Sequence, residues 1–322
     1  MKAVFIEQTG GIEALKYGDF PTPQPGPGEV LVKLAYSGVN FIDTYHRSGL
    51  YKLSLPAVIG SEASGRVEKL GEGVTGLKPG DRVAYTLARG SYAEFHSIPA
   101  VQLVKVPDNV DDATAAASML QGCTAHYLTH STFALKKGQT ALVHAAAGGT
   151  GRLIVQMAAM IGARVIATVG SEAKAKLTLS DGASAAVLYN SQDFVAETKR
   201  LTDGKGVDVI YDGVGQATLL KGFDCLKPRG MMVAFGQSSG PAAPVDLLLL
   251  SQKGSLYVTR PTLFTYIAGR EDLEWRTSDL FRWIGEGKLK INIDKAYPLA
   301  DAAQAHRDIE GRKTTGKLLL KI

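Results

Sequence analysis

The sequence predicts an α/β protein of two domains, a small β-domain and a doubly wound parallel sheet. Three observations lead to this class. The chain has 322 residues, 45% of them apolar, and this length suits two domains better than one core. Short strand patterns fill the first third, whereas strand and helix patterns alternate in the middle. The 36 glycines are typical of an α/β protein with tight turns.

Residues 1–121 are expected to form a mostly antiparallel β-domain, a barrel or a sandwich. The Pro/Gly-rich stretch 21–30 cannot be helical, and apolar or alternating runs on either side of it predict strands at 2–7, 29–39, 90–98 and 102–107. The stretch 76–86 predicts a Gly/Pro turn followed by a strand. After Pro261 the pattern becomes mixed again, with helices expected at 272–287 and 300–311 and a last strand at 316–322. We expect residues 261–322 to complete the first domain.

Residues 122–260 are expected to form the second domain. An Ala-rich helical segment leads into it at 108–133. Six strands are then predicted at 140–145, 163–169, 185–189, 207–212, 231–235 and 255–259. Helical patterns separate them at 151–161, 172–180, 192–201, 217–226 and 245–253. Because parallel neighbours need crossover helices, this alternation predicts a doubly wound parallel sheet.

Charge and cysteine content restrict the class of protein further. Two cysteines, Cys123 and Cys225, are too few for a disulfide framework and suit a reducing compartment. The N-terminus turns polar at Glu7, and the longest apolar run, 245–250, is far too short to cross a membrane. The net charge is +5, but no run of five basic residues occurs. We expect a cytoplasmic protein without a membrane or nucleic-acid partner.

The strongest local motif is a glycine loop between a strand and a helix. The strand is expected at Ala141 to Ala145 and the helix from Gly151, and the loop carries Gly148 and Gly149. Small residues let such a turn close and let backbone approach a pyrophosphate, while the helix start offers free N–H groups. A tight turn without a ligand is the alternative, but the strand–loop–helix context favours a dinucleotide site.

The end of the next strand distinguishes the two nicotinamide dinucleotides. NAD-binding chains place a carboxylate there for the ribose 2′-hydroxyl. Here the strand ends in Gly170 and Ser171, Glu172 follows in the turn, and Lys174 supplies positive charge. This pattern favours NADPH over NADH, although an ordinary exposed helix lysine would give the same sequence.

Several segments together resemble the zeta-crystallin-type NADPH:quinone oxidoreductases, the zinc-free branch of the medium-chain dehydrogenase/reductase superfamily. The resemblance covers essentially the whole chain and rests on residues 37–51, 144–151, 211–215, 235–240 and 254–263. It implies a GroES-like β-barrel domain, a Rossmann domain with the cofactor between the two, and a homodimer. One departure is Gly213, where a serine is familiar in close relatives.

The resemblance also implies site residues. It places Tyr51 where the quinone would enter and assigns Tyr51, Asn40 and Asp43 to positioning substrate and nicotinamide. The residues it assigns to the cofactor are Asn40, Tyr45, Thr124, Gly148, Gly149, Thr150, Gly151, Gly170, Ser171, Lys174, Tyr189, Phe235, Gly236, Ser238, Ser239 and Arg312. For Asn40 and Asp43 a turn-closing role is the alternative, for Tyr51 a half-buried aromatic, and for Arg312 a favourable cation at a helix end.

No metal site is expected. Zinc relatives carry Gly-His-Glu and an upstream cysteine, whereas this chain has Ser61 in the histidine's place and no cysteine before Cys123. Glu62 is then expected to be structural. Cys123, His126 and His130 share one helix face, but a spread of about 10 Å is wide for one ion.

Three functions remain open. The first is NADPH-dependent quinone reduction by hydride or electron transfer without a metal. The second is reduction of activated alkenes such as enals or enones, which uses the same scaffold and cofactor. The third is a non-enzymatic NADPH-binding role, structural or RNA-binding. The glycine loop and Lys174 favour retained cofactor binding in each case.

Overall fold

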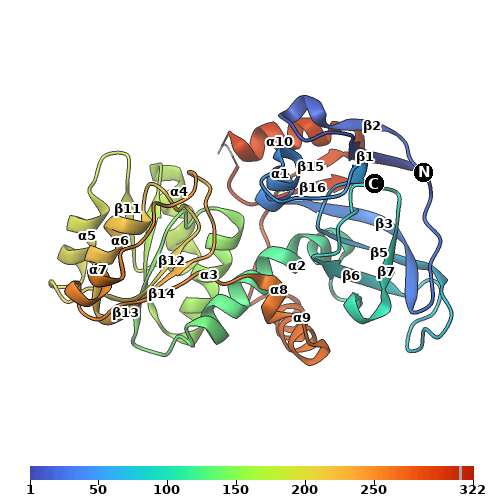
Figure 1. The fold of residues 1–322 in the computed structure, drawn as a ribbon. Helices are drawn as coiled ribbons and strands as arrows, with labels where there is room; N and C mark the ends of the chain where they lie inside the picture. Colours follow the sequence, from blue (N-terminus) through green and yellow to red (C-terminus); the bar gives the residue numbers. More distant parts are fainter. Residues whose placement is uncertain (312–313) are drawn as a thin grey trace. The chain divides into compact units, whose positions relative to one another are not determined.

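The computed structural model describes residues 1–311 and 314–322, and the chain divides into two compact units (Figure 1). Unit 1 consists of Met1–Cys123 and Ile267–Ile322, and unit 2 of Thr124–Tyr266. Unit 1 is built on mostly antiparallel strands and unit 2 on a parallel sheet. The predicted α/β fold class is therefore confirmed.

Unit 1 contains two sheets. The smaller has the order β2-β1-β4 and the larger the order β15-β16-β3-β5-β6-β8, with β7 also paired to β3. The strands are β1 (Lys2–Ile6), β2 (Lys16–Asp19), β3 (Glu29–Val39), β4 (Ala57–Val58), β5 (Glu62–Leu70), β6 (Arg82–Thr86), β7 (Phe95–Pro99), β8 (Val104–Lys105), β15 (Ile293–Pro298) and β16 (Lys317–Lys321). β16 pairs antiparallel with β3, with Leu318 opposite Val39. The end of the chain thus completes a sheet begun by its first third.

In the described part of the chain, four helices belong wholly or mainly to unit 1. They are α1 (Phe41–Ser48), α2 (Asp112–Tyr127), α9 (Arg270–Gly285) and α10 (Ala302–Glu310), with 3-10 turns at Ile12–Ala14, Ala100–Gln102 and Leu299–Asp301. α2 runs on past the boundary at Cys123 into unit 2. It is followed by a π-helical turn, Leu128–Thr132, so the single helical segment expected at 108–133 has two parts.

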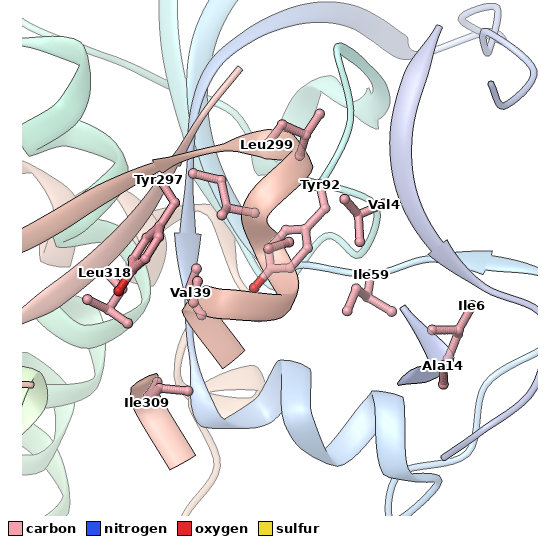
Figure 2. Close-up of a cluster of buried hydrophobic side chains, with 13 residues drawn as sticks. Val4, Ile6, Ala14, Val39, Ile59, Tyr92, Tyr297, Leu299, Ile309 and Leu318 are labelled. Carbon is pink, nitrogen blue, oxygen red and sulfur yellow. The ribbon is translucent and has the colours of Figure 1, made fainter. Parts of the chain in front are cut away.

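One apolar cluster explains why the two ends of the chain share a unit (Figure 2). β1 contributes Val4 and Ile6, β16 contributes Leu318, and α10 contributes Ile309; all are buried. The ring of Tyr92 lies among these side chains. Removing such surface from water is the main favourable term in folding, so the N- and C-terminal segments stabilise one another.

The sheet of unit 2 is parallel throughout, with the order β11-β10-β9-β12-β13-β14. Numbered from β9, this is the order 3-2-1-4-5-6 of doubly wound dinucleotide-binding folds. Its strands are β9 (Thr140–Val143), β10 (Arg164–Val169), β11 (Ala185–Leu188), β12 (Val207–Asp212), β13 (Leu226–Ala234) and β14 (Tyr257–Thr259).

The helices of unit 2 follow its strands along the chain. They are α3 (Gly149–Ile161), α4 (Glu172–Ser180), α5 (Phe194–Leu201), α6 (Leu219–Gly222), α7 (Leu247–Gln252) and α8 (Leu263–Tyr266), with a 3-10 turn at Phe223–Cys225. Leu142, Ile166 and Ile210, from three neighbouring strands, are fully buried with Phe194 of α5. Among the described residues, no helix has the length and apolar character needed to cross a membrane.

Candidate functional site

The glycine loop of unit 2 joins β9 to α3. The strand ends at Val143 rather than at the expected Ala145, because Ala145 has a positive φ of 51° that a strand does not accept. The helix begins at Gly149 rather than at Gly151. Its N-cap is Gly148, and within the described chain no side chain caps it. The first N–H groups of α3 can therefore serve a ligand, and their dipole end favours an anion.

Gly151 permits the closest backbone approach in this loop. A Cβ atom there would lie 2.5 Å from the carbonyl oxygen of Ala145 and 2.8 Å from the Cα of Ala146. Gly148 is less restricted, since its Cβ would lie 3.2 Å from the same carbonyl oxygen. The loop folds tightly over the end of β9 because position 151 has no side chain.

The end of β10 gathers four of the residues expected at a 2′-phosphate. Ser171 is the N-cap of α4, and its hydroxyl accepts a hydrogen bond of 3.4 Å from the backbone N–H of Lys174. Tyr189, which is half exposed, lies so close to Gly170 that a Cβ at Gly170 would be 2.7 Å from the Tyr189 hydroxyl. Asn190 also belongs here, since its side-chain amide donates to the carbonyl of Gly170 at 2.8 Å.

The loops after β12 and β13 are held together by backbone contacts. A Cβ at Gly236 would lie 2.6 Å from the carbonyl oxygen of Gly213, and a Cβ at Gly213 would lie 2.9 Å from the ring of Phe235. Ser238 donates its N–H to the carbonyl of Gly213 at 3.2 Å, and Ser239 donates its hydroxyl to that of Val214 at 2.8 Å. Lacking a side chain at 213, this chain lets the ring of Phe235 lie against the backbone.

Asp212 organises the first of these loops. Its fully buried carboxylate accepts the N–H groups of Val214 and Gly215 at 2.7 and 3.1 Å, and the hydroxyl of Thr218 at 2.8 Å. Buried carboxylates that accept backbone N–H groups hold turns in one conformation. Asp212 therefore supports the loop without being one of the predicted cofactor residues.

Two predicted cofactor residues stand apart from these loops. Thr124 lies in α2 at the first position of unit 2 and is 8% exposed. Arg312 lies outside the described residues.

Two of the predicted residues of unit 1, Asn40 and Asp43, meet at the start of α1. Asn40 is the N-cap, and its backbone N–H donates to Oδ2 of Asp43 at 2.9 Å. Asp43 is fully buried and also accepts hydrogen bonds from the hydroxyls of Ser61 at 2.8 Å and Tyr92 at 3.0 Å. Burial raises the pKa of Asp43 to about 6, although these three donors and the charge of Lys317 act in the opposite direction.

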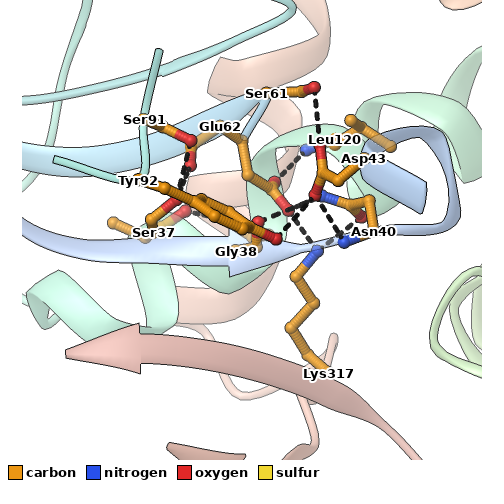
Figure 3. Close-up of polar contacts among 12 residues, drawn as sticks. Ser37, Gly38, Asn40, Asp43, Ser61, Glu62, Ser91, Tyr92, Leu120 and Lys317 are labelled. Atoms are coloured by element: carbon orange, nitrogen blue, oxygen red, sulfur yellow. Dashed lines mark hydrogen bonds and ion pairs between the residues drawn. The ribbon is translucent and has the colours of Figure 1, made fainter. Parts of the chain in front are cut away.

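Beside it lies a buried ion pair (Figure 3). Lys317, at the start of β16, contacts Oε1 of Glu62 and donates to Oδ1 of Asn40 at 2.6 Å. The amide of Asn40 donates to the same Glu62 oxygen at 2.7 Å. The other oxygen, Oε2, accepts the backbone N–H of Leu120 at 2.6 Å. Glu62 is thus structural, as its burial at 0% exposure requires, and each of its oxygens has a partner.

The polar contacts continue from Tyr92 toward the surface. The hydroxyl of Tyr92 lies 3.2 Å from Nε2 of His306, and Nδ1 of that ring lies 3.0 Å from Arg47. Arg47 also forms an ion pair of 2.7 Å with Glu310. Burial, and secondarily the charge of Arg47, lower the pKa of His306 to about 3. His306 is therefore neutral under ordinary conditions.

Tyr51 belongs to a separate aromatic group on the far end of α1. Its ring meets that of Tyr45 edge to face at 5.5 Å and that of His46 at 6.0 Å. Tyr51 is 38% exposed, and its backbone N–H donates to the carbonyl of Tyr45 at 3.2 Å. The structure therefore brings Tyr51 and Tyr45 together and leaves Tyr51 partly exposed.

At the positions where zinc relatives carry histidine and glutamate ligands, this chain has side chains with other partners. Ser61 is 1% exposed and donates to Asp43, while Glu62 is paired with Lys317. His126 and His130 stack ring on ring at 4.4 Å. In the part of the chain that the structure describes, no three His, Cys, Asp or Glu side chains are placed to share an ion.

Lys317 and Tyr92 are the main site residues that sequence reasoning missed. A lysine opening an otherwise apolar strand, 317–321, was the available signal for Lys317. Tyr92 had no comparable signal, because a tyrosine in a predicted strand does not indicate which polar groups its hydroxyl will contact.

Family models match both parts of the chain. Residues 26–108 match the model described as the alcohol dehydrogenase GroES-like domain, and residues 182–320 match the one described as zinc-binding dehydrogenase.

Individual relatives match over nearly the whole chain. A quinone oxidoreductase of Pseudomonas aeruginosa is 46% identical over 99% of both chains. A 2-haloacrylate reductase of a Burkholderia species is 41% identical over 99% of this chain and 98% of its own. A crystal structure of the Escherichia coli quinone oxidoreductase complexed with NADPH superposes with a TM-score of 0.97, at 43% identity and full coverage of both chains. The chain therefore belongs to the quinone oxidoreductase family of the medium-chain dehydrogenase/reductase superfamily.

Proposed function

We propose that this protein is an NADPH:quinone oxidoreductase that works without a metal. The observation that carries this proposal is the uncapped start of α3 beneath the glycine loop, in a chain that superposes on a relative solved with NADPH. When bound, NADPH supplies the hydride. The protein binds and orients the two reactants. A quinone that takes up one hydride and one proton becomes the hydroquinone.

The proposed cofactor residues divide by the part of NADPH that they hold. The pyrophosphate lies against the start of α3, held by Gly148, Gly149, Thr150 and Gly151. The 2′-phosphate is held by Gly170, Ser171, Lys174 and Tyr189, with Arg312. The close approach of Tyr189 to Gly170 and the serine cap of α4 support this grouping. No carboxylate ends β10 to repel a phosphate.

The nicotinamide half is assigned to the remaining predicted cofactor residues. These are Asn40, Tyr45, Thr124, Phe235, Gly236, Ser238 and Ser239. Asp43 holds Asn40 in place through the N-terminus of α1. Tyr51, which is partly exposed, is proposed to contact the quinone. The quinone oxygen takes its proton from water or from a neighbouring hydroxyl, so no dedicated acid is required.

Activated alkenes are the second candidate substrate class. The Burkholderia relative is named a 2-haloacrylate reductase and is nearly as similar as the quinone oxidoreductases. The same hydride donor serves either reaction.

The deciding experiment is NADPH oxidation by the purified protein with ortho- and para-quinones, enones and 2-haloacrylate. Turnover of quinones, unchanged after dialysis against a chelator, is expected. Turnover of alkenes alone would assign the second class, and NADPH binding without any turnover would leave only the non-enzymatic role.

We also propose that the protein is a homodimer formed through β14. This strand is the edge of the unit 2 sheet and carries exposed Tyr257 and Val258. α7, just before it in the chain, exposes Leu247 at 77% and Leu248 at 60%. An exposed apolar edge strand is a template for pairing, and a second copy offers the same edge by twofold symmetry.

A cytoplasmic location is proposed as well. Cys123 and Cys225 are both buried and unpaired, which suits a reducing compartment.

A further inference from the structure

The turn after β11 is held in one conformation by its own contacts. The carbonyl of Leu188, the last residue of β11, accepts the N–H groups of Ser191 at 3.0 Å and Gln192 at 2.8 Å. The side-chain oxygen of Gln192 accepts the N–H of Leu188 at 2.7 Å. Tyr189 and Asn190 lie between these residues. Because the turn is already ordered, a ligand that binds there loses little affinity to ordering it.

This turn lies against the end of β10. β10 and β11 pair in parallel, with Val169 opposite Leu188, and the N–H of Tyr189 donates to the carbonyl of Val169 at 3.1 Å. The next residues along also meet, since the Asn190 amide donates to the carbonyl of Gly170 at 2.8 Å. All five residues belong to unit 2, so the arrangement is complete within one unit.

The contact with Gly170 fixes which end of the Asn190 amide faces the strand. A backbone carbonyl can only accept, so the nitrogen Nδ2 must face it. Nδ2 carries two protons, and this carbonyl takes one of them. Asn190 is exposed, and among the described residues its amide has no other hydrogen-bond partner. The second N–H is therefore a donor for a ligand, held at the end of β10.

A second polar group lies beside the same glycine. A Cβ at Gly170 would be 2.7 Å from the hydroxyl of Tyr189 and 3.6 Å from Nδ2 of Asn190. Ser171 then begins α4, and Lys174 lies in its first turn, so the positive end of a helix dipole and an ammonium charge are added here. Two donors and two sources of positive charge suit an anion that has several acceptor oxygens, as a phosphate has.

We propose that Asn190 is a specificity-determining residue for NADPH: its amide, anchored on the Gly170 carbonyl, donates its second N–H to the 2′-phosphate beside the Tyr189 hydroxyl. The inference rests on the proposed function for the cofactor itself, and it adds a donor that the family resemblance does not assign. Hydrogen bonds to an ionised acceptor are roughly twice as strong as those between neutral groups. The contact therefore favours the phosphate of NADPH over the ribose hydroxyl of NADH.

The main test is Asn190→Ala, which removes the donor and keeps the backbone contacts of Leu188 that hold the turn. Dissociation constants for NADPH and NADH are measured by fluorescence titration, which needs no quinone. We expect the value for NADPH to rise about tenfold, the size of one charge-assisted hydrogen bond, and that for NADH to change by less than about twofold. Equal losses for the two cofactors, or no loss for NADPH, would overturn the proposal.

Asn190→Asp reverses the chemistry of the side chain at nearly constant size. A carboxylate at this position faces the Gly170 carbonyl with a second acceptor and faces the phosphate with a like charge. NADPH affinity should therefore fall further than in Asn190→Ala, while NADH affinity changes little. An NADPH affinity as good as that of Asn190→Ala would show that no phosphate lies beside residue 190.

A double-mutant cycle with Tyr189→Phe separates a direct contact from an effect through Tyr189. If Asn190 binds the phosphate itself, Asn190→Ala still weakens NADPH binding several-fold in the Tyr189→Phe background. No further loss there would mean that Asn190 only places the tyrosine, and the proposal would be wrong. Gln139→Ala is the matched control, because the Gln139 side-chain oxygen accepts the N–H of Lys136 at 2.8 Å in the same unit, just before β9. It should leave both affinities unchanged.

Two small ligands locate the effect on the cofactor. Adenosine 2′,5′-bisphosphate and adenosine 5′-monophosphate carry the adenosine half with and without the 2′-phosphate. By calorimetry, Asn190→Ala should weaken the bisphosphate about tenfold and leave the monophosphate unchanged, whereas equal losses would contradict the contact. A wild type that binds NADPH but reduces no quinone refutes the proposed substrate class and leaves these comparisons intact. A wild type that binds NADPH no better than NADH refutes the cofactor assignment itself.

Discussion

Tyr92 donates a hydrogen bond of 3.0 Å to Oδ2 of Asp43 in the interior of unit 1. The ring of Tyr92 lies in the apolar cluster between the chain's two ends, while its hydroxyl reaches the polar contacts around α1 (Figures 2 and 3). Because that hydroxyl gives its proton to Asp43, it must accept from Nε2 of His306. Arg47 can only donate, so Nδ1 of His306 must accept. The two contacts together fix His306 as the neutral Nε2–H tautomer.

The locked histidine predicts a pH dependence of stability. Burial lowers the pKa of His306 to about 3, and those of His46 and His96 to about 4. Such histidines bind protons more readily in the unfolded chain, so stability rises with pH from about 4 to the ordinary histidine value near 6.5. Asp43 acts in the opposite direction between pH 4 and 6, because its raised pKa of about 6 lets it hold a proton in the folded protein. It contributes one proton, whereas the three histidines contribute one each in the opposite direction. Stability is therefore expected to rise with pH over this range.

The variant His306→Gln isolates one of these protons. Glutamine can accept from Arg47 and donate to Tyr92, but it does not titrate. The slope of unfolding free energy between pH 5 and 6 should fall by about 1.4 kcal/mol per pH unit, measured by guanidinium unfolding. Tyr92→Phe is the comparison variant: it removes hydrogen bonds and lowers stability, but it should change the slope less, because it removes only one of several groups that lower the pKa of Asp43. An unchanged slope in His306→Gln would show that His306 is not the group responsible.

Most of the fold could be predicted because its signals are local. Strands and helices alternate in the sequence of unit 2, and the glycine loop has its own spacing. Element boundaries were harder to predict. β9 ends two residues before the expected Ala145, because Ala145 has a positive φ. Nothing in the sequence indicates a positive φ at an alanine.

The interior of unit 1 could not be predicted in the same way. Lys317 meets Glu62 from 255 positions away and Asn40 from 277. A single lysine in an apolar strand does not show which carboxylate it will meet. The resemblance supplied Asn40 and Asp43, whereas the partners that hold them depend on how β16 pairs with β3.

Gly151 provides a direct test of the glycine loop. In Gly151→Ala the new methyl would lie 2.5 Å from the carbonyl oxygen of Ala145, against backbone that cannot move aside cheaply. We expect a stability loss of about 2 kcal/mol and loss of measurable NADPH binding, since the loop must open where the pyrophosphate would lie. Gly18→Ala is the control, because its methyl would meet only the ring of Phe5 at 3.7 Å. Normal NADPH affinity in Gly151→Ala would refute the proposed contact.

Lys174 tests the choice of cofactor. Lys174→Glu replaces an attraction for the 2′-phosphate by a repulsion, so the dissociation constant for NADPH should rise by about tenfold or more. That for NADH, which lacks this phosphate, should change by less than about threefold. Lys176→Glu makes the same charge change two residues later on α4 and should affect both cofactors little. The measurement is fluorescence titration with each cofactor, and equal losses for NADPH and NADH would contradict the assignment of Lys174.

The edge strand β14 tests the proposed homodimer. In a twofold arrangement each substitution occurs twice at the interface, so Val258→Lys places two charges against apolar surface and against each other. We expect the variant to be a monomer in light scattering at concentrations where the wild type is a dimer. Leu179→Lys is the matched control, since Leu179 is 46% exposed in the same unit but lies on α4 rather than on β14. A Val258→Lys variant that stays dimeric would place the interface elsewhere, and a monomeric wild type would exclude the dimer itself. Because NADPH binding within one protomer does not use β14, the monomeric variant should keep its affinity for NADPH.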